Sequence, residues 1–155
     1  MPQEIERKYL VTGEGWRRTG QGVKYAQGYL SRVAERIVRV RIAGEGAVIT
    51  IKGITCGVSR AEYEYAIPLS DARDLLDLCE RPIIEKTRTT IEFGGRPWEV
   101  DEFHGENAGL IIAEVELANE HDEVQLPPWI GAEVSGDPRY YNSNLSQHPY
   151  REWAR

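Results

Sequence analysis

The sequence predicts a single α+β domain, residues 1–155, in which about eight antiparallel strands form a barrel with a charged interior and a few flanking helices. Polar and apolar residues alternate along most of the chain, as they do in strands. Short turns separate the alternating segments, and strands joined by short turns are antiparallel. Charged residues two positions apart repeatedly carry the same sign, which indicates that the charged faces share one interior.

The predicted strands follow one another with few interruptions. Glycines mark the turns between them, for example at Gly44 and at Gly94-Gly95. The strands are predicted over residues 3–11, 24–33, 35–43, 46–53, 58–68, 82–93, 96–104 and 109–118.

One helix is predicted between these strands, from Ser70 to about Glu80. Ser70 is suited to cap its N-terminus, and Pro82 follows its end. Shorter helices are expected over residues 120–125 and 142–147. The apolar side of the main helix is expected to consist of Leu75, Leu76, Leu78 and Cys79.

Like-charged pairs occupy one face of several predicted strands. Residues i and i+2 of a strand point to the same side, about 6.5 Å apart, so equal charges there repel unless an opposite charge lies nearby. The acidic pairs are Glu62/Glu64, Glu99/Asp101 and Glu114/Glu116, the basic pairs are Arg39/Arg41 and Lys86/Arg88, and Glu4, Glu6 and Lys8 combine both signs.

The ordinary interpretation of any one such pair is a face exposed to solvent. A solvent face usually mixes signs, however, whereas these strands keep the two signs apart. The whole set therefore favours a shared interior, with apolar partners such as Val40 and Val115 packed outward beneath the helices. An eight-stranded barrel has room inside for side chains or one small ligand, so a thin extended anion is expected.

The charged side chains also indicate the chemistry of that ligand. Several cations suit a triphosphate better than a monophosphate, and arginine can hold phosphate oxygens with two parallel donors. The candidate phosphate ligands are Lys8, Arg39, Arg41, Lys52, Lys86 and Arg88. Clustered carboxylates without histidine or cysteine favour Mg²⁺ or Mn²⁺ over Zn²⁺.

Overall composition argues against several classes of partner. The net charge of −6 and the pI near 5.2 do not suit binding to nucleic acid or to an anionic membrane. No apolar run approaches the roughly 20 residues that span a bilayer, and the charged cluster beginning at Glu4 argues against a secretory leader. A cytoplasmic protein is expected, with Cys56 and Cys79 as unpaired thiols.

The segment Glu4-Ile5-Glu6-Arg7-Lys8-Tyr9 resembles the ExExK signature of the CYTH domain, the family of triphosphate tunnel metalloenzymes. The resemblance implies a tunnel of eight antiparallel strands and a divalent-metal-dependent enzyme that acts on a triphosphate. Tyr141 and Ser146 depart from the family pattern, in a segment that lies near one tunnel mouth in the family. Further matching segments are residues 39–41, 50–52, 60–64, 85–88, 101–103, 114–117 and 137–143.

The resemblance also implies roles for individual residues. By this resemblance, Glu62 and Glu64 are expected to hold a second metal ion or to act on the attacking water. The separation of acidic and basic residues, and not the resemblance, suggests that Lys8 assists the leaving group. The metal-binding acids implied by position are Glu4, Glu6, Glu62, Glu64, Asp101, Glu114 and Glu116, while the six cations above are the implied phosphate ligands.

The favoured function is therefore that of a hydrolase, cleaving the terminal phosphoanhydride of inorganic triphosphate. The short chain shows no insertion suited to reading a base. Alternatives are a class IV adenylate cyclase, a nucleoside or thiamine triphosphatase, and a non-catalytic module that binds polyphosphate or nucleotide. A homodimer is compatible with outward-facing aromatic residues, namely Tyr63, Tyr65 and Trp98.

Overall fold

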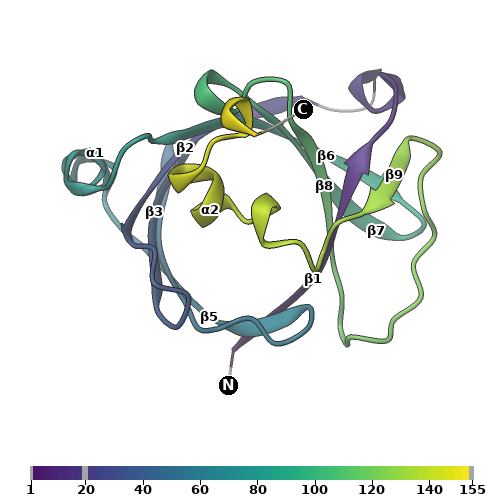
Figure 1. Ribbon diagram of the computed structural model, residues 1–155, viewed down its shortest axis with the longest axis horizontal. Helices are drawn as coiled ribbons and strands as arrows, with labels where there is room; N and C mark the ends of the chain where they lie inside the picture. The colour runs from purple at the N-terminus through teal and green to yellow at the C-terminus, as the bar shows by residue number, and fades with distance from the viewer. Residues whose placement is uncertain (1, 19–20, 154–155) are drawn as a thin grey trace.

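The strands close into a barrel, as Figure 1 shows in a view down the ring. The structure is a computed structural model and describes residues 2–18 and 21–153. Around the ring, antiparallel neighbours follow the order β1, β5, β4, β3, β2, β6, β7, β8 and back to β1, which confirms the predicted eight-stranded antiparallel barrel. The strands are β1 (Gln3–Val11), β2 (Gly22–Ser31), β3 (Ile37–Ala43), β4 (Gly46–Lys52), β5 (Ser59–Ala66), β6 (Ile84–Phe93), β7 (Arg96–Phe103) and β8 (Ile111–Glu116).

A ninth strand, β9 (Ile130–Glu133), was not predicted and extends the sheet beyond the ring, pairing with the C-terminal end of β1. The helix expected over residues 120–125 was wrong, because this segment forms a loop. The carboxylate of Asp122 accepts hydrogen bonds from the backbone N–H groups of Ala118 and Asn119, which holds the chain in a turn. The segment also lacks an apolar face that could pack a helix.

Helix α1 (Leu69–Leu78) lies outside the ring, on the side of β3, at the predicted place (Figure 1). The expected N-cap was wrong: Pro68 occupies that position, the helix begins one residue before Ser70, and no side chain caps it. Ala72 and Cys79 are buried against the barrel, but Leu78 is 72% exposed, so its predicted place on the apolar side was also wrong. The remaining helices are η1 (Gly15–Arg18), η2 (Gly105–Asn107), η3 (Pro138–Tyr140), α2 (Asn142–Gln147) and η4 (Tyr150–Glu152).

The outward faces of β1, β7 and β8 carry the larger outer core. Trp98 is completely buried there, with ring centroids 5.6 Å from Tyr9 and 6.3 Å from Trp129. Val115 belongs to the same core, as predicted for an apolar residue between two inward charges. Trp98 is therefore not available to a dimer interface. Tyr65, another of the aromatic residues expected there, is 56% exposed and so remains accessible.

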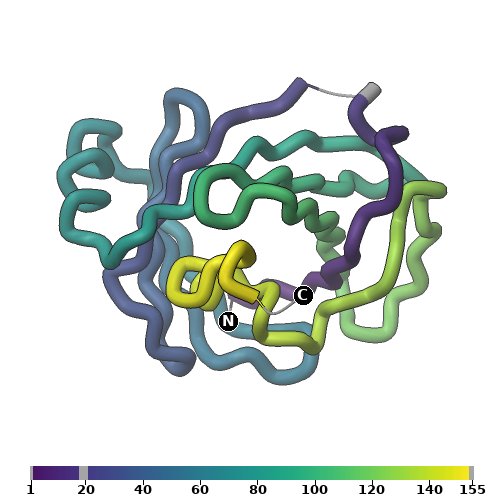
Figure 2. Tube along the Cα trace, turned by 45° about the horizontal axis from the view of Figure 1, so that its top comes forward, coloured from purple at the N-terminus to yellow at the C-terminus, as the bar shows by residue number. Residues whose placement is uncertain are grey.

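One end of the bore, the space enclosed by the eight barrel strands, is apolar and not charged as expected. Helix α2, at its predicted position, lies within the ring in Figure 1, and Figure 2 shows the same C-terminal segment across that end. Leu145 of α2 is completely buried against inward-facing apolar residues of the strands. These residues are Tyr29, Ile37, Ile84, Phe103 and Ile112, with Leu110 and Tyr140 from neighbouring loops.

Cys56 and Cys79 are both free thiols, as predicted. In the described part of the chain, no helix has the length and apolar character that crossing a membrane requires.

Replacing Leu145 with alanine is expected to destabilise the protein by about 2 to 5 kcal/mol, because it leaves a cavity between α2 and the strands. Urea denaturation would measure this loss. The matched control is Leu78→Ala, which should change the unfolding free energy by no more than about 0.5 kcal/mol because Leu78 is exposed. Equal effects of the two substitutions would contradict the packed end of the bore.

Candidate active site

A cavity of about 250 Å³ occupies the charged part of the bore. All the predicted site residues line it except Asp101, and Arg60 and Glu99 line it as well. Its wall carries seven basic side chains and seven carboxyl groups. They are Lys8, Arg39, Arg41, Lys52, Arg60, Lys86 and Arg88, and Glu4, Glu6, Glu62, Glu64, Glu99, Glu114 and Glu116.

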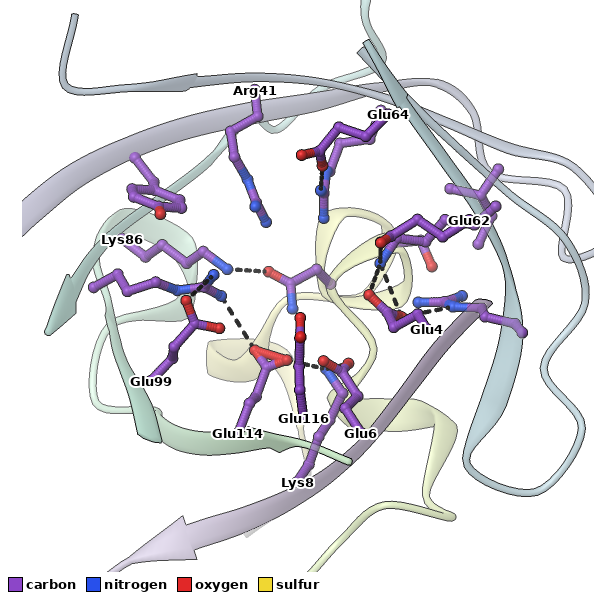
Figure 3. Close-up of a pocket in the computed structure, with 18 of the residues that line it drawn as sticks. Glu4, Glu6, Lys8, Arg41, Glu62, Glu64, Lys86, Glu99, Glu114 and Glu116 are labelled. Carbon is purple, nitrogen blue, oxygen red and sulfur yellow. Dashed lines mark hydrogen bonds and ion pairs between the residues drawn. The ribbon is translucent and has the colours of Figure 1, made fainter. Parts of the chain in front are cut away.

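The two signs are partly separated inside the cavity. In Figure 3, Arg41 and Lys86 project from one side, while Glu4, Glu6 and Glu62 lie on the opposite side. The separation follows from the strand order, because β3 and β6, which carry the basic pairs, both neighbour β2, whereas β5, β1 and β8 lie together on another part of the ring and carry acidic pairs. A ligand in the cavity would therefore meet cations on one side and carboxylates on the other.

Strand register brings some of these charges directly opposite one another. Lys8 faces Glu114 across β1 and β8, which is favourable. Glu6 faces Glu116 across the same two strands, and Glu99 faces Glu114 across β7 and β8. Two carboxylates in direct register repel, so this side of the cavity favours protons or cations between them.

Glu6 and Glu114, diagonal neighbours on β1 and β8 that both contact Lys8, form a further acidic pair. Burial and the charge of Glu114 raise the pKa of Glu6 to about 8. Burial also opposes ionisation of Glu114, but Lys8 and Arg88 outweigh it and hold the pKa of Glu114 well below its usual range. Because the pKa of Glu6 is about 8, the pair holds one proton at neutral pH.

Glu4 and Glu62 form a second pair of the same kind. Burial, the hydrogen bond with Glu4 and the charge of Glu4 raise the pKa of Glu62 to about 7. Burial would raise the pKa of Glu4 too, but Lys52, the hydrogen bond with Glu62 and Arg60 lower it to about 2. The Nζ of Lys52 lies 2.9 Å from Glu4 and 3.4 Å from Glu62, so the lysine bridges the pair.

Asp101 lies behind the cationic side of the cavity and not in its wall. It is completely buried, and its Oδ2 is 2.7 Å from the Nζ of Lys86. It also accepts two hydrogen bonds from Arg88, at 2.7 and 2.8 Å. Although burial opposes ionisation, the two cations lower the pKa of Asp101. Asp101 therefore holds Lys86 and Arg88 in place.

The cations on this side are only partly compensated. Burial, which outweighs the charge of Asp101, lowers the pKa of Lys86 to about 7. Burial and the charges of Arg39 and Arg88 lower the pKa of Arg41 to about 10. Arg39 donates to Thr50 at 3.2 Å, but its buried Nε has no hydrogen-bond partner among the described residues. An anion bound here would supply the missing negative charge and acceptors.

Some residues at the site were not predicted. Arg60 lies two positions before Glu62 on β5, so the same alternation could have identified it, and its Nε is 3.3 Å from Glu4. Tyr25 lines the cavity from β2, with its ring centroid 4.9 Å from the guanidinium carbon of Arg41. Asn142 enters from α2, which only the folded chain brings to the bore.

The carboxylates fit divalent cations by their chemistry. Hard ions such as Mg²⁺ prefer oxygen donors, and the paired carboxyl groups hold protons where a cation would be stabilised. Among residues 2–18 and 21–153, no group of three acidic side chains already converges closely enough to hold a metal. Cationic side chains lie between the carboxyl groups instead, with Lys52 beside Glu4 and Glu62 and Lys8 beside Glu6 and Glu114.

Comparison with known proteins identifies the family. A family profile described as CYTH domain matches residues 2–141. The chain belongs to the CYTH domain family. This CYTH domain is 49% identical over 154 residues to the inorganic triphosphatase of Acetivibrio thermocellus, and the match covers 99% of each chain. It is 37% identical over 152 residues to the inorganic triphosphatase of Nitrosomonas europaea, covering 92% of this chain and 96% of the other.

Solved structures share the tunnel fold of this CYTH domain. The crystal structure of an inorganic triphosphatase superposes with a TM-score of 0.67 at 33% identity, covering 94% of this chain and 95% of the other. A protein from Pyrococcus horikoshii superposes with a TM-score of 0.56 at 18% identity, covering 76% and 80% of the two chains, which shows a shared fold.

Glu6→Gln is expected to raise the thermal stability of the metal-free protein at alkaline pH. The folded-state pKa of Glu6, about 8, exceeds the ordinary value of 4.5, so the wild type loses stability as pH rises between these two values. Glutamine does not ionise and avoids this loss. The melting temperature in EDTA should therefore be higher for the variant at pH 8.5, with the advantage absent near pH 4.5.

The control for this comparison is Glu92→Gln, because Glu92 is exposed on β6 outside the cavity. Its effect on the melting temperature should not depend on pH. An advantage of Glu6→Gln that stays constant from pH 4.5 to 8.5 would contradict the proton held by Glu6 and Glu114.

Proposed function

We propose that this CYTH domain hydrolyses the terminal phosphoanhydride of inorganic triphosphate with Mg²⁺ or Mn²⁺ as the cofactor. One observation carries the proposal: cations on one side of the cavity face carboxyl pairs that hold protons on the other. The relatives that are 49% and 37% identical are both named inorganic triphosphatases, which supports the same substrate here.

The size of the cavity supports an inorganic substrate. Pockets for drug-sized ligands are typically about 300 to 1,000 Å³ and mostly apolar, whereas this cavity measures about 250 Å³ and is lined mainly by charges. A class IV adenylate cyclase or a nucleoside triphosphatase would also need a site for a base. Tyr25, Tyr29 and Ile37 are the apolar or aromatic residues in the lining, so the alternatives with larger substrates are not favoured.

The cationic side would bind the phosphates. Arg41 and Lys86 project into the cavity in Figure 3, and Arg88 is held in a fixed orientation by Asp101. Guanidinium groups hold phosphate oxygens with parallel donors and neutralise the charge that grows as the bond breaks. Arg39, Lys52 and Lys8 complete the proposed phosphate ligands.

The carboxylates would hold the cofactor. Glu4, Glu6, Glu114 and Glu116 are the proposed ligands of one ion, and Glu62 and Glu64 are assigned to a second ion or to the water. Bound divalent ions supply charge neutralisation for phosphate oxygens and acidify a water. Asp101 is left out of this set, because it bonds Lys86 and Arg88 behind the cavity wall.

The protein side chains position the reactants and move a proton. Glu62 has a pKa near 7 and can accept a proton from the attacking water, with Glu64 beside it on β5. Glu114 and Glu6 raise the pKa of Lys8 although burial opposes them, so Lys8 stays charged and can stabilise the leaving phosphate.

We also propose that the protein is cytoplasmic, which fits its two free thiols. A homodimer is compatible with the exposed side chain of Tyr65.

The direct test of this proposal is a panel of substrates and metals. Phosphate release from inorganic triphosphate should exceed release from ATP and pyrophosphate, should require Mg²⁺ or Mn²⁺, and should stop in EDTA. Formation of cyclic AMP from ATP would favour the cyclase. Tight binding of triphosphate without turnover under any metal would favour the non-catalytic module.

Arg41→Ala is expected to raise the KM for triphosphate by about 10- to 100-fold, since it removes a charged hydrogen-bond donor from the cavity. Steady-state kinetics would measure the change. The matched control is Arg73→Ala, on the exposed surface of α1, which should leave KM and kcat unchanged. An Arg41→Ala enzyme with unaltered KM and kcat would disprove the phosphate-binding role.

Activity is expected to rise between pH 6 and pH 9. Glu62, with a pKa of about 7, and Glu6, with a pKa of about 8, must lose their protons before they can bind a cation or accept a proton from water. A profile of kcat/KM against pH at saturating Mg²⁺ would show the rise. A flat profile over this range would count against these roles.

A further inference from the structure

A buried polar cluster joins α2 to the cationic side of the cavity, and the mechanism above makes no use of it. Its two uncharged members are Gln27 of β2, which is completely buried, and Asn142, the first residue of α2. Between them they contact Arg41 and Lys86, two of the proposed phosphate ligands. Each contact is a hydrogen bond of ordinary length.

Asn142 receives two hydrogen bonds on one oxygen. Its Oδ1 accepts from the Nε2 of Gln27 at 3.0 Å and from the Nζ of Lys86 at 3.0 Å. A carbonyl oxygen has two lone pairs, so both are used and the amide has one orientation. Lys86 donates its other recorded bond to Asp101, at 2.7 Å, which directs the ammonium group between the two acceptors.

Gln27 carries the connection on to Arg41. Its Oε1 accepts from the Nε of Arg41 at 2.8 Å, while its Nε2 donates to Asn142 and, at 3.4 Å, to the hydroxyl of Tyr29. The bond at Nε fixes the plane of the guanidinium group and leaves the far nitrogens pointing into the cavity (Figure 3). The amide of Gln27 thus sets the direction in which Arg41 presents its donors.

The packing of α2 determines where Asn142 sits. Leu145 of the same helix is buried in the apolar end of the bore, and Ser143 lies in the cavity lining. A helix seated in this way holds its first residue at a fixed depth. The C-terminal segment therefore does more than close the end of the bore. Its position also determines those of Lys86, through the amide of Asn142, and of Arg41, through the amides of Asn142 and Gln27.

We propose that Gln27 and Asn142 are positioning residues for the reaction, forming a relay from α2 that orients Arg41 and Lys86 toward the substrate. This inference rests on the proposed function for the identity of the substrate. Neither residue needs to touch the triphosphate. Their effect comes from holding two cations in the geometry that binds phosphate, and a displacement of about 1 Å in such a site can cost about 100-fold in rate.

The test uses Asn142→Leu, Gln27→Leu and the double variant, with kcat and KM for triphosphate measured in Mg²⁺. Leucine is similar in size to asparagine and glutamine but cannot accept a hydrogen bond. Each single variant is expected to lower kcat/KM by about 10- to 100-fold, partly through a higher KM. The double variant should be little worse than the poorer single one, because both substitutions break the same relay.

Two further variants separate positioning from folding. Asn142→Asp keeps an oxygen that can accept from both Gln27 and Lys86, so it should recover at least about 10-fold of the activity lost in Asn142→Leu. Asn144→Leu is the matched control on the same helix: it removes a 2.8 Å bond to the carbonyl of Pro138 and should lower the melting temperature without changing KM or kcat.

The proposal is overturned if Asn142→Leu behaves like Asn144→Leu, with a lower melting temperature but unchanged kinetics. It is also overturned if the losses of Asn142→Leu and Gln27→Leu are additive in the double variant.

Calorimetric titration of triphosphate in EDTA distinguishes a failure of the relay from a failure of the proposed hydrolysis. A wild type that binds but does not hydrolyse triphosphate would contradict the activity, while weaker binding by Asn142→Leu would still support the relay and equal binding would refute it.

Discussion

The structure depends on the mutual compensation of charges that a closed sheet forces into one interior. Seven cations and seven carboxylates line one cavity, and a buried charge without a partner would destabilise the fold. Opposite charges therefore pair across strands, and carboxyl groups that lie beside other carboxyl groups hold protons. The cavity is suited to a polyanion and divalent cations because the cations are only partly compensated and the protonated carboxyl groups can be replaced by metal-bound carboxylates.

Alternation of residues predicted much of this from the sequence. The charged pairs at i and i+2 identified the inward faces, and pairs such as Arg39/Arg41 do line the cavity. The same alternation also predicts inward-facing apolar residues. Ile84 lies two positions before Lys86 and therefore points to the same inward side, so the apolar end of the bore could have been predicted from the sequence. Depth was not predictable, because alternation gives the side of a sheet and not the distance along the bore. Asp101 shows this, since it faces inward yet lies behind Arg88.

The C-terminal segment was the harder part to predict, for a physical reason. Strand β9 has four residues and pairs with β1, more than a hundred positions earlier, so local sequence contains little information about it. Helix α2 was located from sequence, but its place inside the ring depends on tertiary packing with Ile84 and Ile112. Asn142 reaches the cavity only through that packing. A residue contributed by a distant segment is identified from contacts and not from a strand pattern.

Triphosphate and divalent cations are expected to replace protons held by the two carboxyl pairs, and the release of protons on binding measures this replacement. Calorimetric titration of wild-type protein with the Mg²⁺ complex of a non-hydrolysable triphosphate analogue at pH 6.5, in buffers of different ionisation enthalpy, gives the number of protons released on binding without turnover. Release of more than one proton is expected, because Glu6 and Glu62 have pKa values of about 8 and about 7, and Glu62→Gln should release fewer protons. Binding with no net proton release, equal in wild type and variant, would contradict this replacement.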